Sequence, residues 1–317
     1  MDLARSTQSV KRAAPVTRFS VIIPCRNAAD YIDRALASVR AQSVAPHELI
    51  VVDDGSTDGS GERVAGHPDA RLLRTEGLGA PAARNAGIDA ASGDYLAFLD
   101  VDDRWLPEHL ARAAALIEGS HPAGLINHRI VVEHETGNVL DHPSPVPGLL
   151  RAHGLAPFID FYRRYRHFTG MSACIARTDR ARLIRGFDRA FPRRHDIEFW
   201  MRLIDCEDWI FDPEPTTLYQ AGTPGSLSAD LIEGTLLRLD AFSRHAPQLR
   251  GQQAYDEFML NLARRALRQN FGTSDDSTWR AMLARCDPYL PRHARLGWRL
   301  VRALPTSRKP LAALGML

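Results

Sequence analysis

Short apolar runs alternate with amphipathic stretches through the first hundred residues of the chain. Residues 19–24 form an apolar, β-branched run that ends at proline, which indicates a strand buried on both faces. After it, apolar side chains recur at helical spacing at Ile32, Leu36 and Val39. The alternation continues with strands predicted at 48–52, 71–75 and 94–99 and a helix predicted at 81–91. This order predicts the α/β fold class, with a mostly parallel sheet and helices on both faces.

From about residue 229 onward the pattern changes to helices alone. Apolar residues recur at helical spacing over 231–242 and 255–271, and prolines interrupt the rest of the chain. We therefore divide the chain into three parts. They are a flexible N-terminal tail at 1–18, an α/β domain at 19–228 and a helical C-terminal extension at 229–317.

The last stretch of the chain, 292–317, mixes basic side chains with leucine, valine and tryptophan. Two interpretations fit this pattern. The segment is either a helix that packs on the α/β domain with its arginines in water, or a basic amphipathic segment that contacts an anionic membrane surface. No run reaches the roughly 18 apolar residues of a membrane span, and the N-terminus lacks the apolar core of a signal peptide. We therefore expect a cytoplasmic protein, peripheral to the membrane under the second interpretation.

Composition narrows the function classes further. Forty basic and 38 acidic residues leave a formal charge of +2, so the chain lacks the strong positive charge of a nucleic-acid-binding protein. The four cysteines show no Cys-x-x-Cys spacing, so neither a structural zinc site nor a disulfide framework is indicated.

Aspartates follow the second and fourth predicted strands. Asp53 and Asp54 end one strand, and Asp100 and Asp102 end the other. Because the carboxyl ends of parallel strands share one edge of the sheet, we expect all four carboxylates in one crevice. Alternation along a strand predicts that Asp100 and Asp102 point to the same side. Two carboxylates there repel each other unless a cation lies between them, and oxygen ligands suit Mn²⁺ or Mg²⁺.

Four segments together resemble the family 2 glycosyltransferases of GT-A fold. They are 22–27 (IIPCRN), 51–58 (VVDDGSTD), 83–87 (ARNAG) and 98–103 (FLDVDD). The resemblance covers roughly 19–228 and implies inverting transfer of a sugar from a nucleotide-diphosphate donor, usually a UDP-sugar, to a hydroxyl acceptor. The Gln-x-x-Arg-Trp motif and membrane spans of the processive members are absent, so we expect a non-processive enzyme. It would serve bacterial surface polysaccharide or glycolipid assembly, with a saccharide or lipid-linked saccharide as acceptor.

The resemblance also implies roles on the donor side. Pro24 and Asn27 would border the nucleobase, and Asp53 or Asp54 would hydrogen-bond it. Arg84 would face the phosphates or the sugar, although an arginine in an alanine-rich helix is equally compatible with a solvated surface position.

The metal and the acceptor side are assigned in the same way. Asp100 would hold the ribose or a metal-bound water, and Asp102 would ligate the Mn²⁺ or Mg²⁺ that bridges the diphosphate. On the acceptor side the matching position is Asp196, which would act as the general base that takes the proton of the attacking hydroxyl. Most relatives carry glutamate directly before this aspartate, whereas this chain has His195.

The segment after Asp196 has the pattern of an amphipathic helix. We expect Phe199, Trp200 and Leu203 in its core and its charged residues outside, with Trp200 as an acceptor-pocket residue in the alternative interpretation. Further on, Gln220 and Thr223 stand where many relatives have arginine and histidine.

Three alternatives remain. Residues 98–102 are also similar to the first motif of haloacid-dehalogenase-type phosphatases, whose first aspartate is a nucleophile, but those proteins place it on the first strand. Residues 77–82 (GLGAPA) match a dinucleotide-binding fingerprint weakly, after the third strand instead of the first. The substitutions at His195 and Thr223 also suit a catalytically silent protein that binds sugar nucleotides.

Overall fold

The structure is a computed structural model that describes residues 17–140, 144, 146–165, 170–223, 231–270, 276–291 and 294. Its strands are β1 (Phe19–Cys25), β2 (Glu48–Asp54), β3 (Ala70–Thr75), β4 (Tyr95–Phe98), β5 (Arg104–Trp105), β6 (Gly124–Glu133), β7 (Leu150–His153), β8 (Cys174–Arg177) and β9 (Asp208–Ala221). Its α-helices are α1 (Ile32–Arg40), α2 (Ser60–Ala65), α3 (Ala80–Ala90), α4 (His109–Ile117), α5 (Leu155–Tyr165), α6 (Thr178–Leu183), α7 (His195–Ile204), α8 (Leu231–His245), α9 (Gln253–Asn270) and α10 (Asp276–Cys286).

One mixed sheet forms the centre of the molecule, with the order β3-β2-β1-β4-β8-β6-β9-β5 and β7 paired to β9. The four predicted strands β1 to β4 are all present and run parallel to one another. Because β2 lies on one side of β1 and β4 on the other, the strand order reverses at β1. In such sheets a ligand crevice opens at this point, beyond the carboxyl ends of the strands.

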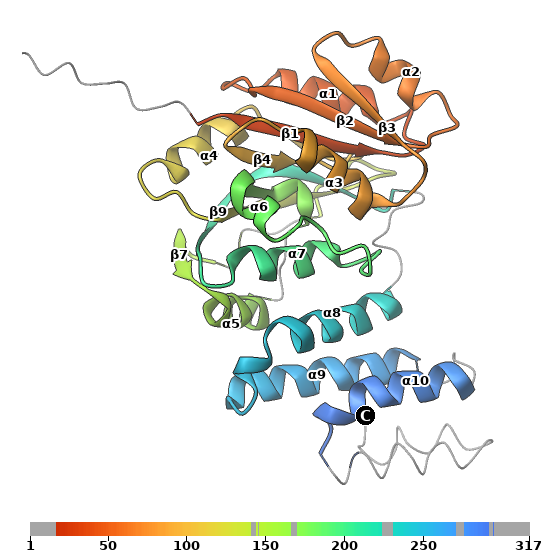
Figure 1. Ribbon diagram of the computed structural model, residues 1–317, viewed down its shortest axis with the longest axis vertical. Helices are drawn as coiled ribbons and strands as arrows, with labels where there is room; N and C mark the ends of the chain where they lie inside the picture. The colour runs from red at the N-terminus through yellow and green to blue at the C-terminus, as the bar shows by residue number, and fades with distance from the viewer. Residues whose placement is uncertain are drawn as a thin grey trace, which may run out of the picture.

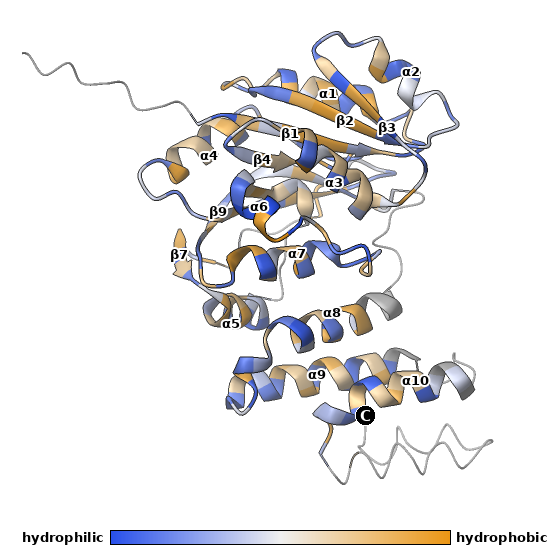
Figure 2. Cartoon of the chain, in the orientation of Figure 1, coloured by the Kyte–Doolittle hydropathy of each residue, from blue (hydrophilic) through white to orange (hydrophobic). Residues whose placement is uncertain are grey.

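The strands of the parallel half are buried on both faces, as their apolar sequence predicted. Val21 and Ile23 of β1 face the side covered by α1 and α4, and Ile22 faces the side covered by α3 and α7. Figure 1 shows these two layers of helices above and below the sheet. The predicted stripe of α1 is confirmed, since Ile32, Leu36 and Val39 are all buried. Figure 2 shows that the hydrophobic residues concentrate along the strands and on the inner faces of the helices.

One detail of the sequence prediction is wrong. Strand β4 ends at Phe98, and Asp100 and Asp102 lie in a turn closed by a hydrogen bond from the Asp103 N–H to the Asp100 carbonyl over 3.0 Å. The alternation of side chains along a strand therefore does not apply to this pair. Their proximity comes from the turn.

The helical C-terminal part packs against the α/β part. In Figure 1 helices α8 and α9 lie in turn below α7, with α10 alongside α9, and α7 contacts α8. Their apolar residues, such as Phe242 and Met259, belong to the same hydrophobic cluster as Phe199 of α7 and Phe98 of β4. The helices predicted at 231–242 and 255–271 correspond to α8 and α9. Among the described helices, none is long and apolar enough to cross a membrane. The predicted amphipathic segment at 292–317 lies outside the described residues apart from Ala294.

Candidate active site

Asp54, at the carboxyl end of β2, holds the turn that precedes α3. Its buried carboxylate accepts hydrogen bonds from the hydroxyl of Thr75 over 2.6 Å and from the backbone N–H groups of Leu78 and Gly79 over 2.8 and 2.7 Å. Gly79 has φ +92°, which a side chain would strain. The glycines that resembled a dinucleotide fingerprint are thus part of a turn that Asp54 anchors. The pKa of Asp54 is lowered because these hydrogen bonds outweigh the effect of burial, which raises it.

Asn27 and Asp53 organise the neighbouring loops. Asn27 adopts φ +48°, and its side-chain oxygen accepts a hydrogen bond from the N–H of Thr57 over 2.9 Å. Its own N–H donates to the hydroxyl of Ser56 over 3.0 Å, and the N–H of Ser56 donates to Asp53 over 3.0 Å. The carboxyl ends of β1 and β2 are thereby fixed to each other. Pro24 pairs with Val52 in the same two strands.

The buried side chain of Asp103 holds the turn 100–103 in place. The carboxylate of this buried residue accepts a hydrogen bond from the hydroxyl of Ser172 and one from the N–H of Gln220 over 2.8 Å. The same Ser172 oxygen accepts the N–H of Asp100 over 3.0 Å. Burial, together with the charges of Asp102 and Asp100, raises the pKa of Asp103 well above its usual range. None of the motifs in the sequence includes Ser172.

Asp102 lies in the same turn, and its carboxylate has a raised pKa. Burial and the neighbouring charge of Asp100 raise its pKa to about 6, while Thr223 and His134 lower it. Thr223, which stands where relatives have histidine, therefore lies beside Asp102. An incoming cation would relieve the repulsion between Asp102 and Asp100. The described residues contain no group of three or more side chains that could hold a metal by themselves. The pair therefore fits an ion that takes its remaining ligands from water and a diphosphate.

Arg84 is buried and lies between the two halves of the site. It forms an ion pair with Asp100, and its Nη1 lies 2.7 Å from Nε2 of His195. The interpretation of Arg84 as a solvated surface residue is therefore wrong. Burial and the charge of Arg84 lower the pKa of His195 to about 3, so this histidine is neutral at pH 7.

Asp196 lies in the first turn of α7 and is partly exposed. The buried thiol of Cys174 locates it relative to the donor side. Burial raises the pKa of Cys174, and the charges of Asp196 and Asp100 raise it further, whereas Arg84 and Arg129 lower it. Asp196 and Asp100 therefore both lie within electrostatic reach of this one side chain. The structure brings the two predicted halves of the site together.

The rest of α7 corrects one expectation. Phe199, Trp200 and Leu203 are fully buried, as predicted, and Trp200 packs against Gly124 in the core, so it is not an acceptor-pocket residue. Glu198 was expected outside but is fully buried too. It forms an ion pair with Arg202 over 2.6 Å, and its Oε1 lies 2.9 Å from Nε2 of His245 in α8. The buried carboxylate therefore has one partner in its own helix and one, 47 positions away, in the C-terminal helices.

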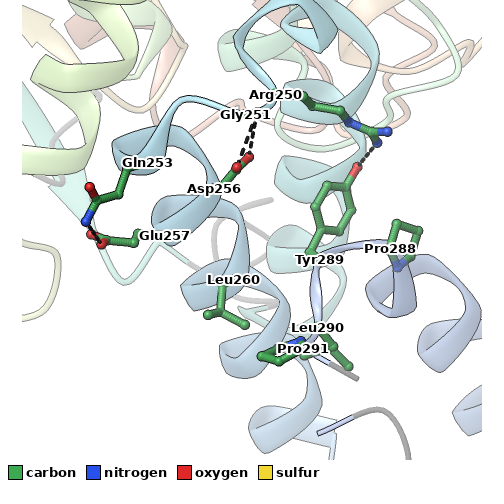
Figure 3. Close-up of a pocket in the computed structure, with 10 residues that line it drawn as sticks. All are labelled: Arg250, Gly251, Gln253, Asp256, Glu257, Leu260, Pro288, Tyr289, Leu290 and Pro291. Carbon is green, nitrogen blue, oxygen red and sulfur yellow. Dashed lines mark hydrogen bonds between the residues drawn. The ribbon is translucent and has the colours of Figure 1, made fainter. Parts of the chain in front are cut away.

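A cavity lies away from these carboxylates, between α9 and the segment 287–291 (Figure 3). It has a volume of about 640 Å³. Its polar groups are paired with one another: Arg250 donates to the hydroxyl of Tyr289 over 3.0 Å, and Gln253 donates to Glu257 over 2.9 Å. None of the predicted site residues lines it.

Comparisons with known proteins agree with this arrangement. Residues 20–180 match the family described as Glycosyl transferase family 2. The amylovoran biosynthesis glycosyltransferase AmsB of Erwinia amylovora is 29% identical over 258 residues, which are 77% of this chain and 83% of that protein. An uncharacterized glycosyltransferase of Nostoc, alr2836, is 37% identical over 121 residues, but these span 38% of its length and 37% of this chain.

The fold is similar to that of a protein of known structure. The crystal structure of S. aureus TarS in complex with UDP-GlcNAc superposes with a TM-score of 0.68 at 19% identity, covering 95% of this chain and 88% of that one. At this identity the likeness concerns the fold. Together with the motif order, the carboxyl-edge aspartates and the family match, it confirms the predicted fold and family: the chain belongs to glycosyl transferase family 2.

Proposed function

We propose that this protein is an inverting, non-processive glycosyltransferase that moves a sugar from a nucleoside diphosphate donor to a hydroxyl group of its acceptor. The observation that carries the proposal is the contact between the two halves of the site, within a chain of this family: Arg84 pairs with Asp100, and its Nη1 lies 2.7 Å from Nε2 of His195, the residue before Asp196. Asp196, from the second half of the domain, is thereby held near the donor-side carboxylate of Asp100. This is the arrangement that direct displacement at a sugar carbon needs.

Asp196 is the general base in this proposal. It accepts the proton of the acceptor hydroxyl as the oxygen forms its bond to the anomeric carbon, and the bond from that carbon to the diphosphate oxygen breaks. The electron pair of the broken bond leaves with the diphosphate. The side chain of Asp196 accepts only one described hydrogen bond, from the N–H of Ile197 over 2.9 Å, so it keeps lone pairs for the hydroxyl proton.

Asp102 and Asp100 would hold Mn²⁺ or Mg²⁺ together with the diphosphate. The ion would neutralise charge on the departing group. The raised pKa of Asp102 supports this assignment, since burial and the neighbouring carboxylate of Asp100 disfavour its charge in the absence of a cation. Pro24, Asn27 and Asp53 or Asp54 would form the nucleobase end of the cleft.

The relatives suggest the substrates. We infer a UDP-sugar donor, because TarS was crystallised with UDP-GlcNAc and a similar E. coli protein, WfgD, is named as a UDP-Glc-dependent glucosyltransferase acting on a diphosphoundecaprenol-linked sugar. A saccharide or lipid-linked saccharide acceptor in bacterial polysaccharide assembly follows from the same names. A cytoplasmic location, with membrane contact through 292–317, belongs to this proposal.

The substitution Asp196→Asn tests the assignment of the base. It keeps the size of the side chain and removes its basicity, so transfer should fall by about 10²-fold or more. Affinity for the nucleoside diphosphate should stay unchanged, because the other half of the site binds it. The measurements are the transfer rate and, by calorimetry, nucleotide affinity on the same variant. Normal transfer, or a parallel loss of nucleotide binding, would show that Asp196 is not the base, and Glu198 is too deeply buried to replace it.

A catalytically silent sugar-nucleotide-binding protein is the second candidate. The observation in its favour is the replacement of family residues at His195 and Thr223. A turnover assay separates the two candidates, because a silent protein would bind the nucleotide sugar without transferring or hydrolysing it.

A further inference from the structure

His195 and Arg84 form a buried contact between the two halves of the site. Arg84 belongs to α3 in the first half, and His195 is the first residue of α7, 111 positions later. The side chain of Arg84 is 4% exposed, whereas that of Asp100, its other partner, is 33% exposed. The guanidinium is therefore shielded from solvent, and the carboxylate is partly exposed.

The protonation state of His195 follows from its partner. A guanidinium has only donors, so Nε2 of His195 must accept the hydrogen bond from Arg84 and the ring proton must sit on Nδ1. A neutral acceptor leaves the positive charge of Arg84 to Asp100. A glutamate at this position would compete with Asp100 for the same charge.

The surrounding contacts fix this geometry. The side-chain amide of Asn85, next to Arg84, accepts the N–H of Phe187 over 2.7 Å and donates to its carbonyl over 2.9 Å. The ring of Phe187 lies 5.7 Å from the guanidinium of Arg84 and 5.7 Å from the ring of His195. A Cβ on Gly186 would lie 2.2 Å from the Asn85 oxygen, so the close approach requires glycine. Helix α3 is thereby clamped to the chain that leads into α7.

We propose that His195 and Arg84 are positioning residues that connect α7 to Asp100. His195 holds Arg84, and Arg84 holds the carboxylate of Asp100 in the orientation that the donor nucleotide requires. Arg84 then acts through Asp100 instead of touching the phosphates or the sugar. Because Asp196 lies on the same helix as His195, this connection also sets the donor carboxylate relative to the base.

The inference rests on the proposed function and is tested by nucleotide binding without turnover. The probe is whichever of UDP, GDP, CDP and dTDP the wild-type chain binds most tightly, measured by calorimetry. Asp100→Asn should weaken binding by about tenfold or more. His195→Met removes the acceptor while filling much of the space, and we expect it to weaken binding by about tenfold, the effect of 1.4 kcal/mol. His195→Gln restores a neutral acceptor and should bind within about twofold of the wild type.

The decisive measurement is the double variant. If His195 acts through Asp100, then His195→Met should cost no further affinity in the Asp100→Asn background, since coupled residues are not additive. Arg84→Met should resemble His195→Met. Much weaker binding by Arg84→Met would mean direct contact with the donor, for instance through Nε, which has no partner among the described residues. That result would overturn the proposal.

His109 offers a matched control. It is another buried histidine, with a pKa lowered to about 3 by burial alone, and it stacks on Trp105 outside the site. His109→Met should lower thermal stability without changing nucleotide affinity. Unchanged binding by His195→Met or by Asp100→Asn, a tenfold loss in His195→Gln, or an undiminished loss in the double variant would each overturn the proposal. A wild-type chain that binds none of the four nucleotides would instead overturn the proposed function, and the inference with it.

Discussion

Two arginines, one beside helix α7 and one within it, differ in what they pair with. Arg84, at its N-terminus, pairs with Asp100, which is 33% exposed, and with a neutral histidine. Arg202, in the last turn of α7 and 19% exposed, pairs with Glu198, which is 0% exposed, and also donates to the carbonyls of Ile184 and Gly186 over 2.7 and 2.8 Å. The carboxylate of the second pair is closed to solvent, whereas that of the first is partly exposed.

The difference distinguishes a pair that belongs to the candidate active site from a pair that stabilises the fold. A carboxylate that reaches solvent can exchange a water for a ligand, and its neighbour Asp102 has too few partners to satisfy its charge. Glu198, Arg202 and His245 have no such freedom, and they join α7 to the C-terminal helix α8. Substitutions in the first group should therefore affect function, and substitutions in the second should affect folding.

The largest expected effect concerns the metal. Asp102→Asn should remove nearly all transfer and donor hydrolysis, because it takes away the carboxylate that would ligate the ion. EDTA should do the same to the wild type, and added Mn²⁺ or Mg²⁺ should restore it. The midpoint of thermal unfolding should not fall, since the substitution relieves repulsion from Asp100. Full activity in the chelator would contradict the metal assignment.

The opposite outcome is expected for the closed pair. Glu198→Gln removes the buried carboxylate from Arg202, which is itself 19% exposed, so we expect a loss of about 3 kcal/mol of unfolding free energy, the lower end of the range for broken buried pairs. Urea denaturation measures this loss. Asp33→Asn, which breaks the exposed pair with Arg63 at 2.9 Å, is the matched control and should cost less than about 1 kcal/mol. Equal effects of the two substitutions would contradict a stabilising role of the Glu198–Arg202 pair.

The pH dependence of stability gives a second test of the role of Glu198 in folding. Burial raises the pKa of Glu198, but His245 and Arg202 lower it more, and the net pKa is about 2, against 4.5 for an ordinary glutamate. Its contribution is therefore complete above pH 4.5 and is lost as the pH falls toward 2, by up to about 3 kcal/mol. Urea denaturation at several pH values should show the wild type and Glu198→Gln converging as the pH decreases. A constant difference down to pH 3 would contradict this.

Local patterns in the sequence were enough for the order of elements in the parallel half and for the position of its aspartates. Strand β1 and helix α1 formed where their apolar patterns placed them, because such patterns are properties of short segments. The aspartates after β2 and β4 lie at one edge because parallel strands end together. The four motifs in order were also sufficient for the family.

Tertiary structure alone decided which charged groups are satisfied. Glu198 was expected as a solvated residue of an amphipathic helix. Its buried carboxylate pairs with Arg202 of the same helix, and Nε2 of His245, brought in by α8, lies 2.9 Å from it. Arg84 was equally compatible with solvent, and its buried contact with His195 comes from 111 positions away. A helical period predicts that a face is polar, but the cost of burying a charge depends on its partners. His195 and His245 lie far in the sequence from the groups they contact, so no local pattern could identify them.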